Sequence, residues 1–590
     1  MTDPAAESAA AAMPGLAELQ QWTRIMGEAQ QAMLEAGIGL VSAAPAGGGW
    51  PTMPAGGPGA MASAASGALS GEAMAGWWRD GMALWGRVIA GEPAAVPEPA
   101  AHLADKRFKG DAWREPWFDW MRRSYLAVAD HLLAGVDAMG DVEPERREAI
   151  RFATRALVDA LSPANFAVTN PEVIARARET NGESLLAGLR HLLADLGKGQ
   201  LTHTDAAAFE VGRNLAVTPG QVVKRTALYE LIQYAPTTPE VLAAPLVIFP
   251  PWINRFYILD LTPEKSFIRW CVEQGITVFI VSWRSADASH RDVTWDDYVL
   301  AQVEAVDTAR DLLSVPAVHT IGYCVAGTTL AATLAVLASR GEAERIASAT
   351  FFTAQVDFAG AGDLRHFVDD EQIARLSSLA PDGYFDGRYM AATFNLLRGR
   401  DLIWNYVVSN YLLGEAHKPF DLLHWNGDTT NLPAVWHRSY LSDLYRDNLL
   451  VQPGALSVDG TPIDLGKVET PAYVQAGRED HIAPPESVWR ITEHFRGPLR
   501  FVLAGSGHIA GVVNPPAAGK YQHWVNDYPA ATLAEFVAGA REVKGSWWPD
   551  WLAWLVAHGG ERVVAAGARM PGEGALPALA PAPGEYVRAR

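Results

Sequence analysis

Cysteine is scarce in this sequence. Only Cys271 and Cys324 occur among its 590 residues, which excludes a network of disulfide bonds and indicates a reducing compartment. Long apolar runs are also missing, and no stretch of about 18 uncharged apolar residues predicts a membrane span. The first 15 residues, MTDPAAESAAAAMPG, contain neither the basic nor the apolar segment of a signal peptide. These absences predict a cytoplasmic protein.

Basic residues and metal-ligand patterns are sparse as well. The 48 Lys and Arg are outnumbered by 67 Asp and Glu, giving a net charge of −19, which argues against nucleic-acid binding. A local basic pocket for a polyanionic small substrate remains compatible with this charge. The 15 histidines show no HExxH spacing and two cysteines cannot form a thiolate site, so no metal is expected. Tryptophan, by contrast, is abundant. Its 21 residues fit either a large aromatic core or a surface that binds an apolar ligand.

The chain divides into three regions. Residues 1–75 are rich in Ala, Gly, Met, Ser and Pro, and such a segment is expected to be disordered apart from a helix near 16–38. Residues 76–200 show amphipathic helical periodicity and predict an α-helical N-terminal domain. Residues 201–590 begin with two β-rich runs in 211–234, joined by a Thr-Pro-Gly turn. The length itself exceeds one compact core, so more than one domain is expected.

Short apolar strands then alternate with helices, at 244–250, 276–283, 317–323, 345–353, 471–477 and 499–505. Continuous apolar strands between helices predict an α/β fold with a mostly parallel sheet covered on both faces. The alternation is interrupted between 356 and about 450 by an aromatic, helical stretch. An insertion between strands of an open sheet lies above their carboxyl ends, where ligands bind, so this stretch is interpreted as a cap.

The segment GYCVAG at 322–327 follows a strand and opens a helix. Its G-x-C-x-A-G form is that of a nucleophile elbow in which Cys324 replaces serine, with Ala326 where the usual elbow has glycine. The small residues Gly322, Ala326 and Gly327 allow strand and helix to approach closely. The N-terminus of the helix would favour the Cys324 thiolate, and the Val325 amide would bind an oxyanion. A buried structural cysteine is the alternative.

Two later loops supply partners for this cysteine. The strand at 471–477 is followed by Glu479, Asp480 and His481, and the strand at 499–505 by His508. Nucleophile, acid and histidine in this order, each after a strand, are typical of the α/β-hydrolase fold. Cys324, Asp480 and His508 are therefore the predicted triad, with Glu479 and His481 as rivals. Cys271 lies inside an amphipathic helix and is expected to be a packing residue.

Distinctive motifs carry a resemblance over roughly residues 100–590. The chain resembles the class I polyhydroxyalkanoate synthases, which belong to the α/β-hydrolase superfamily, and Ala326 is its main departure from their pattern. The matching pieces are RFKGDAW (107–113), NFAVTNPEV (165–173), GRNLAVTPGQVV (212–223), PPWINRFYILDL (250–261), GYCVAGT (322–328), RDLIWNYVVSNYLLG (400–414), LHWNGDTTNLP (423–433), GREDHIAP (477–484), GSGHIAGVVNPP (505–516), GSWWPDWLAWL (545–555) and APGEYV (582–587).

The resemblance implies that (R)-3-hydroxyacyl-CoA is added to a growing polyester and that free CoA leaves. His508 would deprotonate Cys324, whose thiolate attacks the thioester; Asp480 would orient His508 or help activate the hydroxyl. Trp252 or Ile253 would supply a second oxyanion amide. No cofactor is implied, since the CoA thioester is the substrate. The closing cap would exclude water.

Further expectations follow from the same resemblance. Short-chain monomers are favoured, with Ala510 beside the histidine shaping the pocket. A homodimer through the cap and association with polyester granules are also implied. Arg398 and Lys520 are candidates to bind the CoA phosphates, with ordinary solvated cations as the alternative.

Two other classes of function compete with the polymerase. A thioesterase or polyester depolymerase with a cysteine nucleophile would use the same fold. A non-catalytic protein that coats granules would use the tryptophans and the N-terminal segment, although the complete triad argues against that as the whole function. The aromatic cap, the helical N-terminal domain and GSWWPDWLAWL at 545–555 favour the polymerase.

Overall fold

A computed structural model describes residues 99–140 and 142–589. The expected disorder of residues 1–75, the helix near 16–38 and the start of the helical domain at 76–98 lie outside the described residues. The chain forms two compact units. One contains the N-terminal helices up to His203 together with Ala392–Lys418, and the other contains Thr204–Ala391 and the chain from Pro419 onward.

The first unit is helical. Its longer helices are α5 (Pro116–Asp137), α6 (Pro144–Ala160), α7 (Pro171–Glu179) and α8 (Glu183–Lys198), preceded by the short α4 (Ala100–Leu103). Proline begins three of them at a position where its missing N–H costs nothing. Asn170 caps α7 by accepting the amides of Glu172 and Val173.

Residues 392–418 belong to this helical unit, although the sequence placed them in the cap at 356–450. They contain the end of α13 (Gly387–Leu397) and two π-helical segments, η11 (Arg400–Trp404) and η12 (Val407–Leu412). Arg400 pairs with Asp159 at 2.7 Å, and the Tyr411 hydroxyl donates to Asp195 at 2.6 Å. These contacts with the N-terminal helices explain why the insertion is divided between the two units.

The second unit contains an eleven-stranded sheet in the order β15-β14-β13-β12-β7-β6-β4-β5-β2-β1-β17. Neighbouring strands are parallel from β13 to β5, and the outer strands on both sides are antiparallel. The parallel strands are β4 (Leu246–Phe249), β5 (Val278–Trp283), β6 (Val318–Tyr323), β7 (Ile346–Phe352), β12 (Ala472–Gly477) and β13 (Leu499–Ala504). All six coincide with the predicted strands, and the predicted α/β-hydrolase fold is confirmed.

The outer strands are β1 (Gly220–Arg225), β2 (Tyr229–Tyr234), β14 (Gln522–Val525), β15 (Arg541–Lys544) and β17 (Ala580–Pro581). The prediction of a strand before Gly220 was wrong. Residues 211–219 form turns instead, because Ala216 adopts a positive φ of 53° and its amide donates to Asp260 at 2.8 Å. The Thr-Pro-Gly sequence therefore leads into β1, and the turn that joins β1 to β2 is at 226–228.

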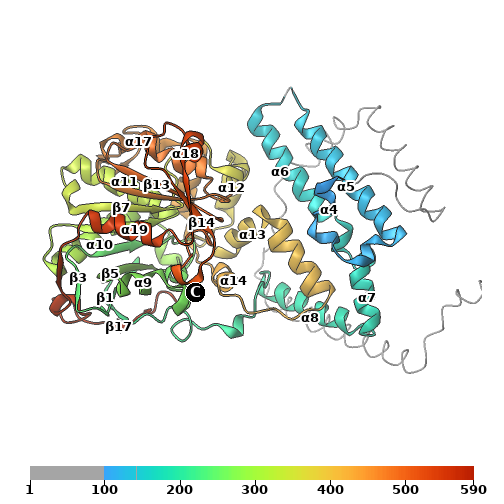
Figure 1. The fold of residues 1–590 in the computed structure, drawn as a ribbon, viewed down its shortest axis with the longest axis horizontal. Coiled ribbons are helices and arrows are strands. Elements are labelled where there is room, and N and C mark those ends of the chain that lie inside the picture. The colour runs from blue at the N-terminus through green and yellow to red at the C-terminus, as the bar shows by residue number, and fades with distance from the viewer. Residues whose placement is uncertain (1–98, 141, 590) are drawn as a thin grey trace, which may run out of the picture. The chain divides into compact units, whose positions relative to one another are not determined.

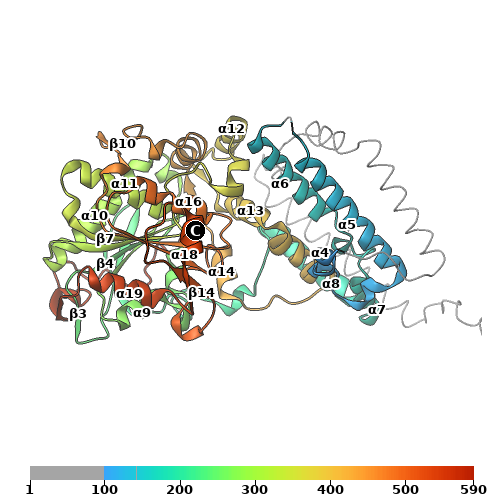
Figure 2. The ribbon, with the colours of Figure 1, turned by 45° about the horizontal axis from the view of Figure 1, so that its top comes forward.

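Helices cover both faces of the sheet (Figures 1 and 2). One face packs against α10 (Trp295–Leu313) and α11 (Val325–Arg340), and the other against α9 (Phe267–Glu273) and α19 (Trp548–Ala557). Each face has its own apolar cluster, and Cys324 is packed against both. In the described residues no helix is long and apolar enough to cross a membrane.

The remaining elements are short. They are β3 (Glu240–Leu242) with β16 (Arg562–Val564), β10 (Ser457–Val458) with β11 (Thr461–Pro462), β8 (Tyr384–Phe385) with β9 (Leu432–Pro433), and the helices α12 (Asp370–Ser378), α14 (Asp421–Gly427), α15 (Ala434–Ser439), α16 (Pro485–Trp489), α17 (Ile491–His494) and α18 (Leu533–Gly539).

Candidate active site

Cys324 occupies the sharp turn between β6 and α11. Its φ of 52° and ψ of −127° lie outside the conformations that a side-chain-bearing residue prefers. The turn is kept in place because the Cys324 amide donates to the Phe352 carbonyl at 2.9 Å, and the Cys324 carbonyl accepts from Gly327 at 2.8 Å and Thr328 at 3.1 Å. This is the geometry of a nucleophile elbow, which lifts the side chain above the sheet.

Two glycines allow strand and helix to approach each other at this turn. A Cβ on Gly322 would lie 2.5 Å from the Gly327 Cα, and a Cβ on Gly327 would lie 2.4 Å from the Ala354 Cβ. Gly322 and Gly327 must therefore be small, as expected, because the Gly327 backbone and the Ala354 side chain lie too close for a larger residue. Ala326 is fully buried with its methyl group accommodated in the core.

Asp480 follows β12 and is bound on both carboxylate oxygens. Oδ1 accepts the amides of Ile482 at 2.9 Å and Ala483 at 3.0 Å. Oδ2 lies 2.7 Å from Nδ1 of His508. The side chain is buried, whereas that of the neighbouring Glu479 is exposed. Of the two predicted acids, the structure thus brings Asp480 to the histidine.

His508 follows β13, and its side chain is only 10% exposed. Its backbone carbonyl accepts the Tyr323 hydroxyl at 2.9 Å, which fixes the loop against β6. Burial disfavours the imidazolium, but the negative charges of Asp480 and Cys324 outweigh it and raise the pKa of His508 to about 10. His481, the rival histidine, is half-buried in the loop of Asp480.

The predicted oxyanion amides follow two adjacent strands. Val325 is the first residue of α11, where a helical N–H has no partner within the helix. Ile253 lies in the loop after β4, which pairs in parallel with β6 so that Phe249 is opposite Gly322. The two loops therefore leave the same edge of the sheet.

Comparisons with known proteins identify related families for both parts of the chain. Residues 104–271 match the model of the poly-beta-hydroxybutyrate polymerase (PhaC) N-terminus, and residues 245–515 match that of the alpha/beta hydrolase fold. A poly(3-hydroxyalkanoate) polymerase subunit from Cupriavidus necator is 46% identical over 522 residues, covering 87% of each chain. A poly(3-hydroxyalkanoate) polymerase from Methylorubrum extorquens is 46% identical, covering 86% of this chain and 84% of its own.

The chain belongs to the poly(3-hydroxyalkanoate) polymerase family. The family predicted from the sequence motifs is thereby confirmed, as is an acyltransferase-type enzyme on an α/β-hydrolase fold.

Aromatic residues of the cap lie close to the cysteine of this polymerase. The Tyr440 and Tyr445 side chains are buried, and burial together with the negative charge of Cys324 raises the pKa of both phenols. Beside them, Trp436 packs against Trp252 with ring centres 5.2 Å apart. Trp252 in turn stacks on Tyr298 at 3.9 Å, next to the loop of the candidate oxyanion amide.

Gln355 was missed by the sequence reasoning. It follows the carboxyl end of β7, donates to the Tyr445 hydroxyl at 3.3 Å and accepts the Ser487 hydroxyl at 3.0 Å. Its carbonyl accepts the Thr328 hydroxyl at 2.7 Å. This one residue thus links the cap, the helix after Asp480 and the helix after Cys324. Its place just beyond a parallel strand was the signal that could have identified it.

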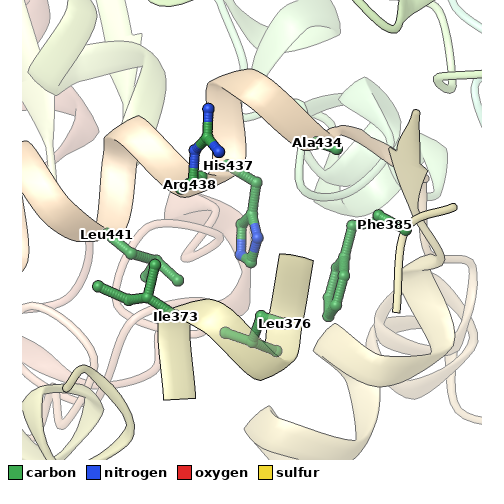
Figure 3. A pocket seen from close by; sticks show the side chains of 8 residues that line it. Ile373, Leu376, Phe385, Ala434, His437, Arg438 and Leu441 are labelled. Carbon is green, nitrogen blue, oxygen red and sulfur yellow. The ribbon is translucent and has the colours of Figure 1, made fainter. Parts of the chain in front are cut away.

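A small apolar pocket lies within the part of the cap that belongs to the catalytic unit (Figure 3). Side chains from α12 and from the helix containing His437 face each other across it, and the His437 ring stacks on Phe385 at 4.6 Å. Burial lowers the pKa of His437 to about 4, so the ring is neutral at physiological pH. The lining residues are Ile373, Leu376, Ala380, Phe385, Ala434, His437, Arg438 and Leu441.

The two predicted CoA-binding cations are exposed and belong to different units. Arg398 lies in the helical unit, where it pairs with Asp401 at 2.7 Å. Lys520 lies in the catalytic unit, in the loop after His508. The structure therefore does not assign them to one site.

The described part of the chain offers one group of possible metal ligands. Asp357, Glu493 and His494 have ligand atoms within 4.8 Å of one another. The Asp357 carboxylate, however, already pairs with Arg490 at 3.0 Å and accepts the Asn448 amide at 3.0 Å. These partners explain the cluster as a link between the cap and the helices after Asp480.

Proposed function

We propose that this polymerase forms its polyester through a covalent acyl-Cys324 intermediate, with (R)-3-hydroxyacyl-CoA as the acyl donor. The observation that carries the proposal is the His508 ring, which interacts with Cys324 and bonds Asp480 through Nδ1 at 2.7 Å. The raised pKa of His508 makes its ring a ready acceptor for the Cys324 proton. The thiolate forms when that proton passes to His508.

The first step transfers the acyl group to the enzyme. The Cys324 thiolate attacks the thioester carbonyl, and the amides of Val325 and Ile253 stabilise the oxyanion that develops. The carbon–sulfur bond to CoA breaks, and the His508 imidazolium gives its proton to the departing CoA thiolate. One thioester replaces another, so this exchange is close to thermoneutral.

The second step forms the polyester bond. Neutral His508 takes the proton of a 3-hydroxyl group, from a monomer or from a chain end, as that oxygen attacks the acyl-Cys324 carbonyl. The Cys324 thiolate leaves, and the imidazolium–thiolate pair returns. Asp480 keeps Nδ1 of His508 protonated and directs the other ring nitrogen to these transfers.

Polymerisation requires that water does not hydrolyse the acyl-enzyme. The buried aromatic side chains of Trp436, Tyr440 and Tyr445 provide an apolar surface next to Cys324. We infer that this surface binds the acyl chain. Ala510, beside His508, limits the length of the side chain that the monomer can carry, so short-chain monomers are preferred. No cofactor takes part in this scheme.

Three further features belong to the proposal. Arg398 and Lys520 are the candidate contacts for the CoA phosphates. The enzyme acts as a homodimer through the cap region. In the cell it is cytoplasmic and associates with the surface of the polyester granule. These features follow from the family resemblance, and each can be tested without the others.

A Cys-dependent thioesterase or polyester depolymerase would use the same three residues. The assay is therefore to incubate purified protein with (R)-3-hydroxybutyryl-CoA and to follow both CoA release and turbidity. A polymerase releases CoA and produces turbid polymer. CoA release with soluble 3-hydroxybutyrate and no polymer would refute the polymerase proposal. No CoA release from the wild type would refute both enzymatic functions and leave the granule-coating alternative.

The two cysteines give a matched pair of variants for this assay. Cys324→Ala should abolish CoA release and turbidity, because no nucleophile remains. Cys271 is buried in α9, and burial raises the pKa of its thiol well above its usual value. Cys271→Ala should therefore keep both signals. Equal loss in the two variants would show that Cys324 has no special role.

A further inference from the structure

Arg255 is a buried charge in the loop of the candidate oxyanion amide. It lies two residues after Ile253, between β4 and the short helix η6 (Phe256–Asp260), and is 2% exposed. Its Nη1 donates to the Tyr586 carbonyl at 3.1 Å and its Nη2 to the Ala589 carbonyl at 2.8 Å. Its Nε lies 3.6 Å from Asp428. The guanidinium thus joins this loop to residues about 330 positions later in the chain.

The 580–589 segment that receives Arg255 is itself firmly attached. The fully buried Glu230 carboxylate accepts the amides of Glu585 at 2.9 Å and Tyr586 at 3.0 Å. The Tyr586 hydroxyl donates to the Thr226 carbonyl at 2.7 Å. At its start, β17 pairs with β1. The carbonyls that accept from Arg255 therefore have fixed positions relative to the sheet.

The same loop is braced from its other side by residues 425–430. The Trp425 indole donates to the Arg255 carbonyl at 2.7 Å, and the Thr430 hydroxyl donates to the Trp252 carbonyl. Asn254 forms an isolated β-bridge with Thr429. With Arg255 attached to the 580–589 segment, the peptide that contains Ile253 is constrained from both directions.

A buried guanidinium needs hydrogen-bond acceptors in fixed positions. Its desolvation is costly, and its planar set of N–H donors fixes the directions of its hydrogen bonds. The Asp428 carboxylate at 3.6 Å is too distant for a short hydrogen bond, and the Tyr257 hydroxyl also donates to it at 3.0 Å. The Tyr586 and Ala589 carbonyls accept two hydrogen bonds of the guanidinium from fixed positions. Their loss would remove these two bonds, and the loop that carries Arg255 would be held less firmly.

We propose that the 580–589 segment, acting through Arg255, positions the oxyanion loop of this polymerase. Arg255 is a positioning residue in this assignment, since its contacts are with the loop and the segment. The assignment rests on the proposed function, in which the amide of Ile253 stabilises the oxyanion. It predicts that breaking the attachment slows acylation of Cys324 without changing the reactivity of its sulfur in a reaction that needs no oxyanion.

Two reactions of the same thiolate separate these effects. Single-turnover CoA release from (R)-3-hydroxybutyryl-CoA passes through an oxyanion, whereas alkylation of Cys324 by iodoacetamide does not. Cys271→Ala serves as the background, so that only one thiol reacts. In Arg255→Gln the acylation rate should fall at least about tenfold, since a missing oxyanion donor costs about 10²–10³. The alkylation rate should equal that of the Cys271→Ala parent. An unchanged alkylation rate would also show that the site is folded.

Matched variants sharpen the test. Arg588→Gln makes the same charge change in the same segment, at an exposed side chain that donates to the Val211 carbonyl and not to the oxyanion loop, and should change neither rate. Removal of residues 582–590 should slow acylation selectively, as Arg255→Gln does. Combining this truncation with Arg255→Gln should add no further loss, because both changes break one connection.

The outcomes are distinct. Parent-like acylation in Arg255→Gln, or an equal fall in acylation and alkylation, would overturn the positioning role. Additive losses in the combined variant would show that the segment acts by another route and would overturn it too. Absence of CoA release from the parent would refute the proposed function, and the assignment with it. If the Cys271→Ala parent releases CoA and Arg255→Gln releases it at the same rate, only the positioning role of Arg255 is refuted and the proposed function stands.

Discussion

Ala326 is the residue at which this chain departs from the usual nucleophile elbow. It is the second residue of α11, fully buried, and its carbonyl accepts the Gln302 amide at 3.0 Å. The close contacts at the elbow are made by Gly322 and Gly327 instead. An alanine methyl group at position 326 is thus compatible with the turn, and it fills space in the core.

Ala326→Gly is therefore expected to destabilise the fold without changing the chemistry. Glycine in a helix is less stable than alanine by roughly 0.5–1 kcal/mol because its unfolded chain has more freedom. The denaturant midpoint should fall correspondingly, whereas the rate of single-turnover CoA release should stay that of the wild type. A more stable or markedly faster variant would indicate that the methyl group strains the elbow.

The ion pair of His508 predicts a pH dependence of stability. Because the pKa of His508 is raised from about 6.5 to about 10 in the folded state, the folded state binds the proton more tightly. The resulting stabilisation is fully present below pH 6.5 and is lost as the pH rises through about 10. Denaturant unfolding of the wild type and of His508→Gln should therefore show a difference that shrinks between pH 6.5 and 10. A difference independent of pH would contradict the imidazolium assignment.

At the scale of elements, the six parallel strands and the order of nucleophile, acid and histidine could be predicted from the sequence. Each central strand is an apolar run, because both faces of the sheet are covered. The choice of Asp480 over Glu479 needed the structure to show which carboxylate is buried. Residues 211–219 were predicted to be β-rich, but Ala216 has a positive φ and its amide donates to the Asp260 carbonyl, which is not a strand geometry.

The hydrogen-bond partners of Arg255 and Gln355 could not have been predicted from local sequence. Arg255 donates to carbonyls more than 300 positions away, and Gln355 bonds to residues 90 and 132 positions later. Hydrogen bonds of this kind depend on how distant loops meet above the sheet. Periodicity and motif spacing describe one element at a time and therefore give no sign of them.

The cap pocket around His437 gives a prediction of its own (Figure 3). Since burial lowers the pKa of His437 from about 6.5 to about 4, the unfolded state binds the proton more readily. Stability of the packing between α12 and α15 should thus be constant above pH 6.5 and fall as the pH drops toward 4. The protection factors of residues 370–380 against hydrogen exchange, which allow for the slower intrinsic exchange in acid, should fall at pH 5 in the wild type. His437→Gln, which cannot be protonated at this position, should lack this fall. An equal fall in both proteins would contradict the prediction.

At the scale of the whole molecule, the two units are interleaved along the chain. The helical unit includes Ala392–Lys418, which lies between cap elements of the catalytic unit in the sequence. His203 bonds the Leu402 carbonyl at 2.7 Å, and Gly188 of α8 lies against the backbone of Tyr411. A change on α8 can therefore disturb a segment that is continuous with the cap.

Gly188→Ala tests this continuity. A Cβ at position 188 would lie 1.8 Å from the Tyr411 carbonyl oxygen, so residues 392–418 must move away from α8. Hydrogen exchange of these residues should increase, and the displaced segment should slow polymer formation through its covalent connection to the cap. Gly197→Ala is the matched control, because nothing lies within 4 Å of its added Cβ. That variant should gain up to about 1 kcal/mol in unfolding free energy, since alanine is favoured over glycine in a helix. If Gly188→Ala exchanges faster at residues 392–418 but polymerises like Gly197→Ala, the N-terminal unit does not influence the cap.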